Sequence, residues 1–239
     1  MKHVCLAAVA LLAGTASWAA EFSVTPVRIF MTPRDRAVAV TVVNEGNEEL
    51  VMQSELYQWT QNPTGEDTLT PTEDVVLSPP ILKLGPKARQ VLRLARVGAA
   101  PAGREQSFRM IVREVPEAKP SQDKEVKVQM ALAFSLPIFI TPAGAKRNLR
   151  CAVERSAPQV VKVECTNAGN AYAQIRGMTL QSAAGEAIAT RDVVAYILPD
   201  IKRAFELQSA SARIPAGSVR LNVAFDDGTT QVFDGTLPD

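Results

Sequence analysis

Two cysteines are the residues of this chain whose spacing most directly predicts chemistry. Cys151 and Cys165 flank a turn centred near Pro158, and counting outward from the turn places them opposite each other in a hairpin. Directly opposed strand positions bring Cβ atoms close enough for a disulfide. A redox pair is the alternative, but the spacing is not the Cys-x-x-Cys of thiol oxidoreductases. We therefore expect a structural disulfide, Cys151–Cys165.

Histidine is missing after the first twenty residues, because the chain's single histidine is His3. Without histidine, a Ser-His-Asp triad, a Cys-His pair and a histidine metal site are excluded. Asp226-Asp227-Gly228 stands between two expected strands and is typical of a hairpin turn. Too few oxygen ligands lie nearby in sequence for calcium. We expect no metal, no other cofactor and no enzymatic activity.

The first twenty residues have the pattern of a cleaved signal peptide. Lys2 and His3 give a positive start, and residues 4–13 are apolar but too few to span a bilayer. Ser17-Trp18-Ala19 supplies small residues for a cut after Ala19 or Ala20. We expect export of the mature chain to an oxidising compartment, where Cys151 and Cys165 would pair. A membrane anchor is the weaker alternative.

The charge of the chain is balanced. There are 26 Lys and Arg residues, one of which (Lys2) leaves with the signal, against 25 Asp and Glu. A nucleic-acid partner would favour a basic surface, so we expect none, and we do not expect a membrane-embedded or membrane-surface protein.

The apolar pattern predicts an all-β fold. Short alternating runs are separated by Pro, Gly, Asn and Asp turns, and no long segment has a helical period. A boundary is expected at residues 137–144, so that signal peptide 1–20 is followed by domains 21–140 and 141–239, each suited to one β-sandwich. The expected strands are 38–43, 50–59, 89–96, 108–115, 126–140, 149–154, 160–165, 173–180, 196–198, 204–207, 219–225 and 231–233.

The run from residue 126 alternates most strictly. Its small or polar positions point one way, and the opposite face carries Val126, Val128, Met130, Leu132, Phe134 and Leu136. Taken alone, this pattern favours an ordinary strand whose apolar face lies in its own core.

Several motifs occur in order along the chain. Residues 78–94 contain Ser-Pro-Pro-Ile-Leu-Lys-Leu-Gly-Pro and then Gln-Val-Leu-Arg-Leu, and residues 108–116 read Phe-Arg-Met-Ile-Val-Arg-Glu-Val-Pro. Residues 27–30 (Val-Arg-Ile-Phe) precede them, and weaker matches follow at 167–170 and 196–199. In this order and spacing the sequence resembles the PapD-like periplasmic pilus chaperones of the chaperone–usher pathway.

The resemblance implies two immunoglobulin-like domains and a periplasmic chaperone that binds pilus or fimbrial subunits and delivers them to an outer-membrane usher. It reverses the interpretation of the alternating run, whose large residues become a donor strand: Val126, Val128, Met130, Leu132 and Phe134. It also implies that Arg28 holds the subunit's terminal carboxylate by charge-assisted hydrogen bonds, whereas a solvated arginine is the plainer alternative. Self-association of the unloaded protein is a further expectation.

The sequence departs from the family pattern at the expected cleft. Pro137 stands where a second cation, a lysine, is usual. Glu105 is at the place of an inter-domain glutamate, but Thr141 replaces the arginine that partners it. We therefore expect a weakened carboxylate clamp and a weakened inter-domain ion pair. The short loop at 116–124 favours a divergent, archaic-like branch.

Two other classes of function compete with a chaperone. A secreted immunoglobulin-like adhesion or carbohydrate-binding module would show exposed aromatic residues, but aromatics are only 5% of this chain. A glycosidase would need two paired carboxylates, and no such pair is evident.

Overall fold

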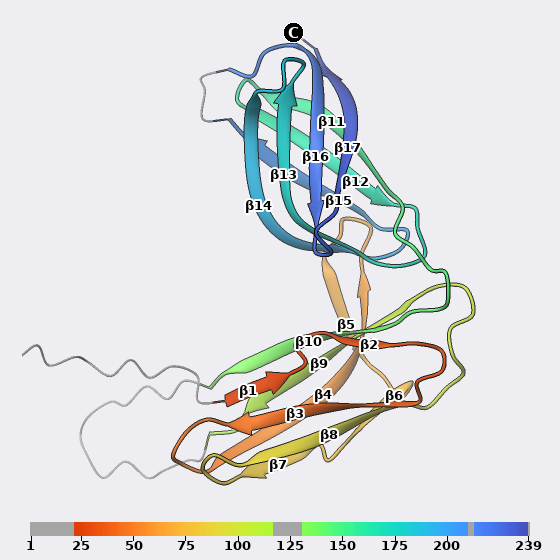
Figure 1. Ribbon diagram of the computed structural model, residues 1–239, viewed down its shortest axis with the longest axis vertical. Coiled ribbons are helices and arrows are strands. Elements are labelled where there is room, and N and C mark those ends of the chain that lie inside the picture. Colours follow the sequence, from red (N-terminus) through yellow and green to blue (C-terminus); the bar gives the residue numbers. More distant parts are fainter. Residues whose placement is uncertain (1–21, 117–130, 210–212, 239) are drawn as a thin grey trace, which may run out of the picture.

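The computed structural model describes residues 22–116, 131–209 and 213–238. In these ranges the chain forms the strands β1 to β17, and no helix there has the length and apolar character needed to cross a membrane. The strands gather in two lobes that meet at a bend, β1 to β10 in one and β11 to β17 in the other (Figure 1). The prediction of an all-β chain is confirmed.

The first lobe packs two sheets face to face. One has the strand order β1-β3-β8-β6 and the other β2-β10-β9-β4-β5, with β7 paired to β4. Strand alternation builds the core between them, because every second residue points inward. Val40 and Val42 of β3, with Leu92 of the neighbouring β8, share one buried cluster with Met110 of β9 in the other sheet. The strands are β1 (Phe22–Thr25), β2 (Ile29–Met31), β3 (Ala37–Asn44), β4 (Leu50–Gln61), β5 (Asp67–Pro71), β6 (Val75–Ser78), β7 (Ile81–Leu84), β8 (Arg89–Arg96), β9 (Gln106–Glu114) and β10 (Ala133–Ile140).

The second lobe is a smaller sandwich. Its sheets have the orders β11-β12-β15 and β14-β13-β16-β17, and Val161 and Val163 of β12 face Leu221 and Val223 of β16 in a second buried cluster. The strands are β11 (Leu149–Ala157), β12 (Val160–Asn167), β13 (Ala173–Ser182), β14 (Ala187–Ile197), β15 (Lys202–Gln208), β16 (Gly217–Phe225) and β17 (Thr230–Leu237).

The cysteines of the second lobe form the expected disulfide. Cys151 on β11 and Cys165 on β12 are directly paired in register, and their Cα atoms are 4.1 Å apart. Cys165 is fully buried in the lobe's core, with Cys151 packed against that core. The prediction of a Cys151–Cys165 disulfide is confirmed.

Candidate functional site

Strand β10 has an open edge along half of its length. It pairs with β9 from Ala133 to Ile140, but its other edge pairs with β2 only over Ile138–Ile140. From Ala133 to Pro137, no strand of the described ranges pairs with that edge. Unpaired backbone N–H and C=O groups at such an edge are a template for a strand of another chain.

The apolar row of the expected donor strand is divided at this edge. Leu132 and Phe134 keep 40% and 37% of their surface exposed, and the Phe134 ring meets Phe22 edge-on, with centroids 4.9 Å apart. Leu136, which we expected in the same outward row, is instead buried in the first lobe's core. At Leu136 the apolar side of β10 packs into the core between the two sheets of the first lobe. Val126, Val128 and Met130 lie outside the described residues.

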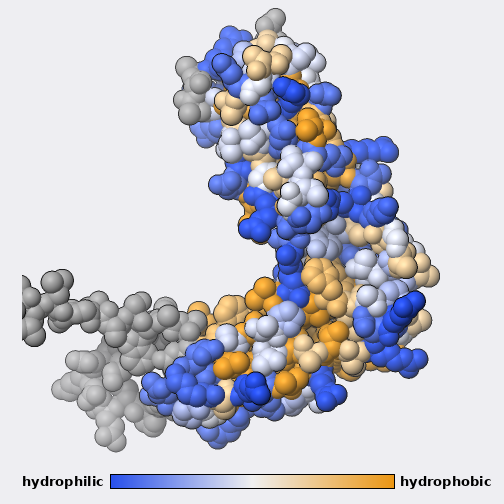
Figure 2. Space-filling model, viewed as in Figure 1, coloured by the Kyte–Doolittle hydropathy of each residue, from blue (hydrophilic) through white to orange (hydrophobic). Residues whose placement is uncertain are grey.

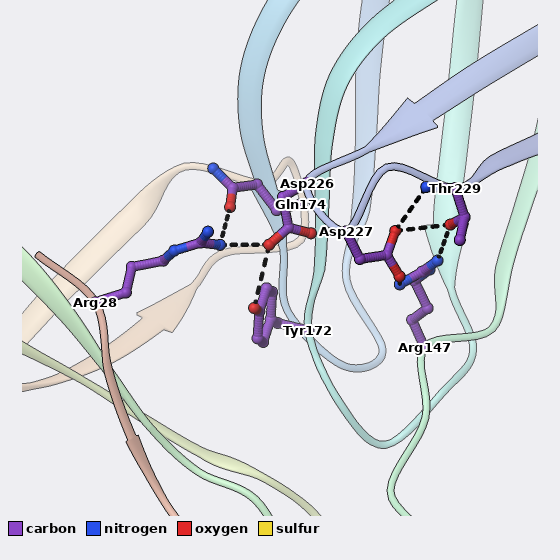
Figure 3. Close-up of polar contacts among 7 residues, drawn as sticks. All are labelled: Arg28, Arg147, Tyr172, Gln174, Asp226, Asp227 and Thr229. Atoms are coloured by element: carbon purple, nitrogen blue, oxygen red, sulfur yellow. Dashed lines mark hydrogen bonds and ion pairs between the residues drawn. The ribbon is translucent and has the colours of Figure 1, made fainter.

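Arg28 reaches from the first lobe into the second. It directly precedes β2, level with Pro137, because the next residue, Ile29, pairs with Ile138. Its Nη1 donates a hydrogen bond to Gln174 Oε1 at 2.7 Å and forms an ion pair with Asp226 (Figure 3). Arg28 is therefore a part-buried, paired arginine rather than one that only water solvates. Burial alone would lower its pKa, but hydrogen bonding and the charge of Asp226 outweigh burial, and the pKa is raised.

The β16–β17 turn presents two consecutive carboxylates that point to different partners (Figure 3). Asp226 faces Arg28, and the hydroxyl of Tyr172 lies 3.5 Å from the same carboxylate oxygen. Asp227 instead binds residues of its own lobe. Its Oδ2 accepts a hydrogen bond from Arg147 Nη1 at 2.8 Å, and its Oδ1 accepts hydrogen bonds from the N–H and hydroxyl of Thr229. Arg147 and Thr229 together hold the pKa of Asp227 at about 2.

Glu105 joins the lobes through hydrogen bonds. Thr141 Oγ1 donates to one carboxylate oxygen at 2.6 Å, and the backbone N–H of Tyr172 donates to the other at 2.8 Å. The residue is only 5% exposed. Burial raises its pKa, although the two hydrogen bonds act in the opposite direction. At this position a hydrogen-bonded link therefore replaces the ion pair that the family pattern implies.

Gln61, at the end of β4, makes a second link between the lobes. Its Nε2 donates to the carbonyl of Tyr196 at 3.1 Å, while its Oε1 accepts from the N–H of Leu198 at 2.9 Å. The side-chain amide therefore pairs with backbone of the other lobe as a neighbouring strand would.

Aromatic side chains fill the junction of the lobes. Phe139 of β10 is fully buried and stacks on Tyr172 with centroids 3.9 Å apart, and Trp59 meets Tyr196 edge-on at 5.2 Å. Trp59 is only 2% exposed, so it gives a sugar ring no surface to stack on. Phe30, 52% exposed, extends this stack outward. Figure 2 shows apolar side chains gathered on the first lobe on the side toward the bend.

Comparison with known proteins settles the family. Residues 21–146 match the family described as "Pili and flagellar-assembly chaperone, PapD N-terminal domain". The chain belongs to this family. The match covers more than half of the chain and includes Arg28, the open edge of β10 and Thr141.

Curated proteins that match the chain are named as chaperones. Chaperone protein LpfB of Salmonella typhimurium is 30% identical over 148 residues, which are 60% of this chain and 60% of that protein. The probable fimbrial chaperone YadV of Escherichia coli is 29% identical over 156 residues, 62% of this chain and 61% of that protein. The chain spans about three-fifths of the length of these relatives.

Solved structures show the same fold. The chaperone–tip adhesion subunit complex CsuC-CsuE from the archaic Csu pili of Acinetobacter baumannii gives a TM-score of 0.67 at 20% identity, covering 92% of this chain and 100% of that chain. The YadV chaperone gives 0.63 at 21%, covering 91% and 100%. These neighbours have two immunoglobulin-like domains, which confirms the predicted fold class.

This PapD-like chain has a second arginine beside the position of the missing lysine. Arg109 on β9 pairs in register with Pro137, and its guanidinium lies 3.7 Å from the ring centroid of Trp59. The side chain is 13% exposed, Asp67 lies 3.7 Å away, and burial lowers the pKa of Arg109. Our sequence reasoning did not assign Arg109 to the site, although pairing residues 108–115 with 133–140 as antiparallel neighbours would have placed it there.

Proposed function

We propose that this protein is a periplasmic chaperone that binds pilus or fimbrial subunits by donor-strand complementation and delivers them to an outer-membrane usher. The open edge of β10 from Ala133 to Pro137, with Leu132 and Phe134 exposed beside it, carries the proposal. Chaperone–pilin complementation is an established instance of strand addition to a sheet edge.

The edge has the two properties that strand donation needs. Unpaired backbone groups give affinity that does not depend on the partner's sequence, and alternate large side chains fill a partner's groove. Each apolar side chain that becomes fully buried contributes about 1.5–3 kcal/mol. Leu132 and Phe134, continued by the sequence pattern at Met130, Val128 and Val126, would therefore cover much of an incomplete subunit core.

Arg28 is the proposed anchor for the subunit's terminal carboxylate. Its guanidinium lies level with Pro137 at the inner end of the open edge, and it already holds a carboxylate, that of Asp226. Because proline stands at position 137 of β10 in place of the usual lysine, Arg28 is the one cation of the proposed anchor. We expect Arg28 to contribute less than a two-cation clamp would.

We further propose that the protein binds its partners without catalysing a reaction, that it acts in the periplasm, and that an outer-membrane usher is its second partner. The proposed domain boundary lies between Ile140 and Thr141, and it is supported by the end of β10 at Ile140 and by the absence of a strand shared between the sheets of the two lobes. Residues 1–20, expected to be a signal peptide, lie outside the described residues.

Co-purification from periplasmic extract tests the proposal. The protein, co-expressed with secreted pilus-type subunits encoded near it, should bring one of them through two purification steps. Hydrogen exchange at residues 132–137 should slow in that complex relative to the free protein, since a partner strand would protect the edge. An adhesion module would bring no subunit, and a complex that leaves residues 132–137 unprotected would contradict strand donation.

A further inference from the structure

Asp226 places a carboxylate on Arg28 where the proposed function requires the carboxylate of a subunit. The two residues lie 198 positions apart and on different lobes. We propose that Asp226 is an internal occupant of the Arg28 anchor, and that the terminal carboxylate of a subunit displaces it on binding. The inference deepens the proposed function and rests on it.

Charge balance favours exchange over simultaneous binding. The charge of Arg28 is already neutralised by Asp226, so a further carboxylate placed on Arg28 would be repelled by Asp226. Residue 137, level with Arg28 on β10, is a proline and supplies no second cation. Arg109, on the other side of Pro137, is 13% exposed and stacked on Trp59, with Asp67 3.7 Å away. An incoming carboxylate therefore has to take the place of Asp226.

The surroundings allow this exchange. The side chain of Arg28 is 32% exposed, which leaves a path for an incoming group. Asp226 borders a cavity of about 550 Å³ that is also lined by Lys146 and Arg147. A displaced Asp226 side chain can turn toward these cations. The turn itself stays held by Asp227, which accepts hydrogen bonds from Thr229 and not from Arg28.

Displacement has a measurable consequence for affinity. A site that is free in only a fraction of molecules binds with an affinity reduced by that fraction. A part-exposed ion pair is a weak contact, and an occupant held by one would weaken subunit binding about two- to sixfold. Because Asp226 and Arg28 come from different lobes, subunit binding would also loosen one contact between the lobes.

The test compares two neighbouring carboxylates of one turn. Asp226→Asn keeps the shape and an acceptor for Arg28 but removes the charge, whereas the matched control Asp227→Asn removes a charge held by Arg147. With the subunit that co-purifies with the wild-type protein as probe, Asp226→Asn should bind about two- to sixfold more tightly. Asp227→Asn should bind as the wild type does. In an Arg28→Ala background, Asp226→Asn should have no effect on affinity.

The outcomes separate this inference from the proposed function. If Arg28→Ala weakens binding while folded Asp226→Asn binds equally or less tightly, Asp226 is only a link between the lobes and the inference is wrong. If Arg28→Ala leaves binding unchanged, the carboxylate anchor of the proposed function fails instead.

A second measurement needs no subunit. Sodium acetate is titrated against sodium chloride of equal ionic strength, and the side-chain N–H resonance of Arg28 is followed by NMR. The resonance, assigned by its loss in Arg28→Ala, should respond to acetate at lower concentration in Asp226→Asn than in wild type. Identical responses would overturn the inference even if no subunit were found. Should Asp226→Asn fold poorly, Asp226→Ser serves the same comparison.

Discussion

The two halves of β10 differ in what completes them. From Ile138 onward the strand is paired on both edges, and Phe139 is fully buried against Tyr172 of the other lobe. From Ala133 to Pro137 one edge has no strand partner within the described ranges, and Phe134 is 37% exposed. One half is finished by the chain itself, whereas the other is suited to completion by another chain.

This difference separates stability from binding along a single strand. Changes in the finished half should act on the folded protein, because they remove contacts that exist before any partner arrives. Changes at Leu132 and Phe134, beside the open edge, should act mainly on the complex, because these side chains keep more than a third of their surface exposed in the free protein. The following experiments test that separation, starting with the largest effect.

The double change Met130→Asn with Leu132→Asn should abolish subunit retention. Two apolar contacts worth about 1.5–3 kcal/mol each would be lost, and a polar group left unpaired in the subunit core costs about 1–3 kcal/mol more. The melting temperature of the free protein should change little. Co-purification yield and thermal melts measure the two quantities, with Ala131→Ser as the control on the opposite face. An unfolded double mutant would assign this row to the protein's own core.

Phe139→Ala should destabilise the protein by about 3–5 kcal/mol, the usual range for truncating a fully buried phenylalanine. Phe134→Ala, five residues earlier on the same strand, should cost clearly less, because its ring is 37% exposed. Urea unfolding of both variants measures the difference. Equal losses of unfolding free energy would remove the distinction between the two halves.

Loss of the Cys151–Cys165 bridge should affect stability without affecting binding, because it lies in the second lobe, away from both halves of β10. The bridge spans 14 positions, and the chain-entropy estimate for such a loop is about 3 kcal/mol. Paired Cys→Ala variants should therefore unfold at lower urea concentration yet retain the subunit. Titration of two free thiols in denatured, unreduced wild-type protein would contradict the bridge.

Glu105→Gln should change how the free energy of unfolding varies with pH more than it changes that free energy near pH 4. Burial raises the pKa of Glu105 in the folded state above its ordinary value of about 4.3. The folded state therefore binds the proton more tightly, so the contribution is present below the unfolded pKa and is lost as pH rises through the folded pKa. Near pH 4 the two proteins should differ by less than about 1 kcal/mol, because glutamine can still pair with Thr141 and Tyr172.

As pH rises toward 7, the wild type should lose stability relative to Glu105→Gln. Urea unfolding at intervals from pH 4 to 7 measures both slopes. Parallel slopes would show that Glu105 keeps an ordinary pKa in the folded protein.

Patterns that are local in sequence predicted much of the fold. The alternation of residues 38–43 and the spacing of Cys151 and Cys165 each reflect one strand or one hairpin, whose geometry repeats every two residues. The alternation expected for the long strand does not hold over residues 136–140, which are all buried. Edge and surface strands were missed or shortened. Strand β14 runs over Ala187–Ile197, but only its end was predicted, because Arg191 and Asp192 interrupt its apolar pattern. The exposed β5 (Asp67–Pro71) has no buried face that could reveal it.

The inter-lobe contacts were less accessible from sequence. The departures at Pro137 and Thr141 are visible in the chain, but the partner of Arg28 lies 198 residues away, and no local pattern marks Asp226 as different from Asp227. One of the two donors to Glu105 is a backbone N–H, that of Tyr172. Every residue except proline has such a group, so residue types could not identify it.

Gln61 has a consequence for how sequences with this architecture can diverge. Within the first lobe its amide donates to Asp67 Oδ1, and across the junction it pairs with the carbonyl of residue 196 and the N–H of residue 198. Nearly any amino acid supplies these two backbone groups at those positions. The Gln61 link therefore does not depend on the side chains at 196 and 198, whereas the packing of Tyr196 against Trp59 and the burial of Leu198 do. Position 61 itself has little such freedom, since few side chains offer a donor and an acceptor at the required distance.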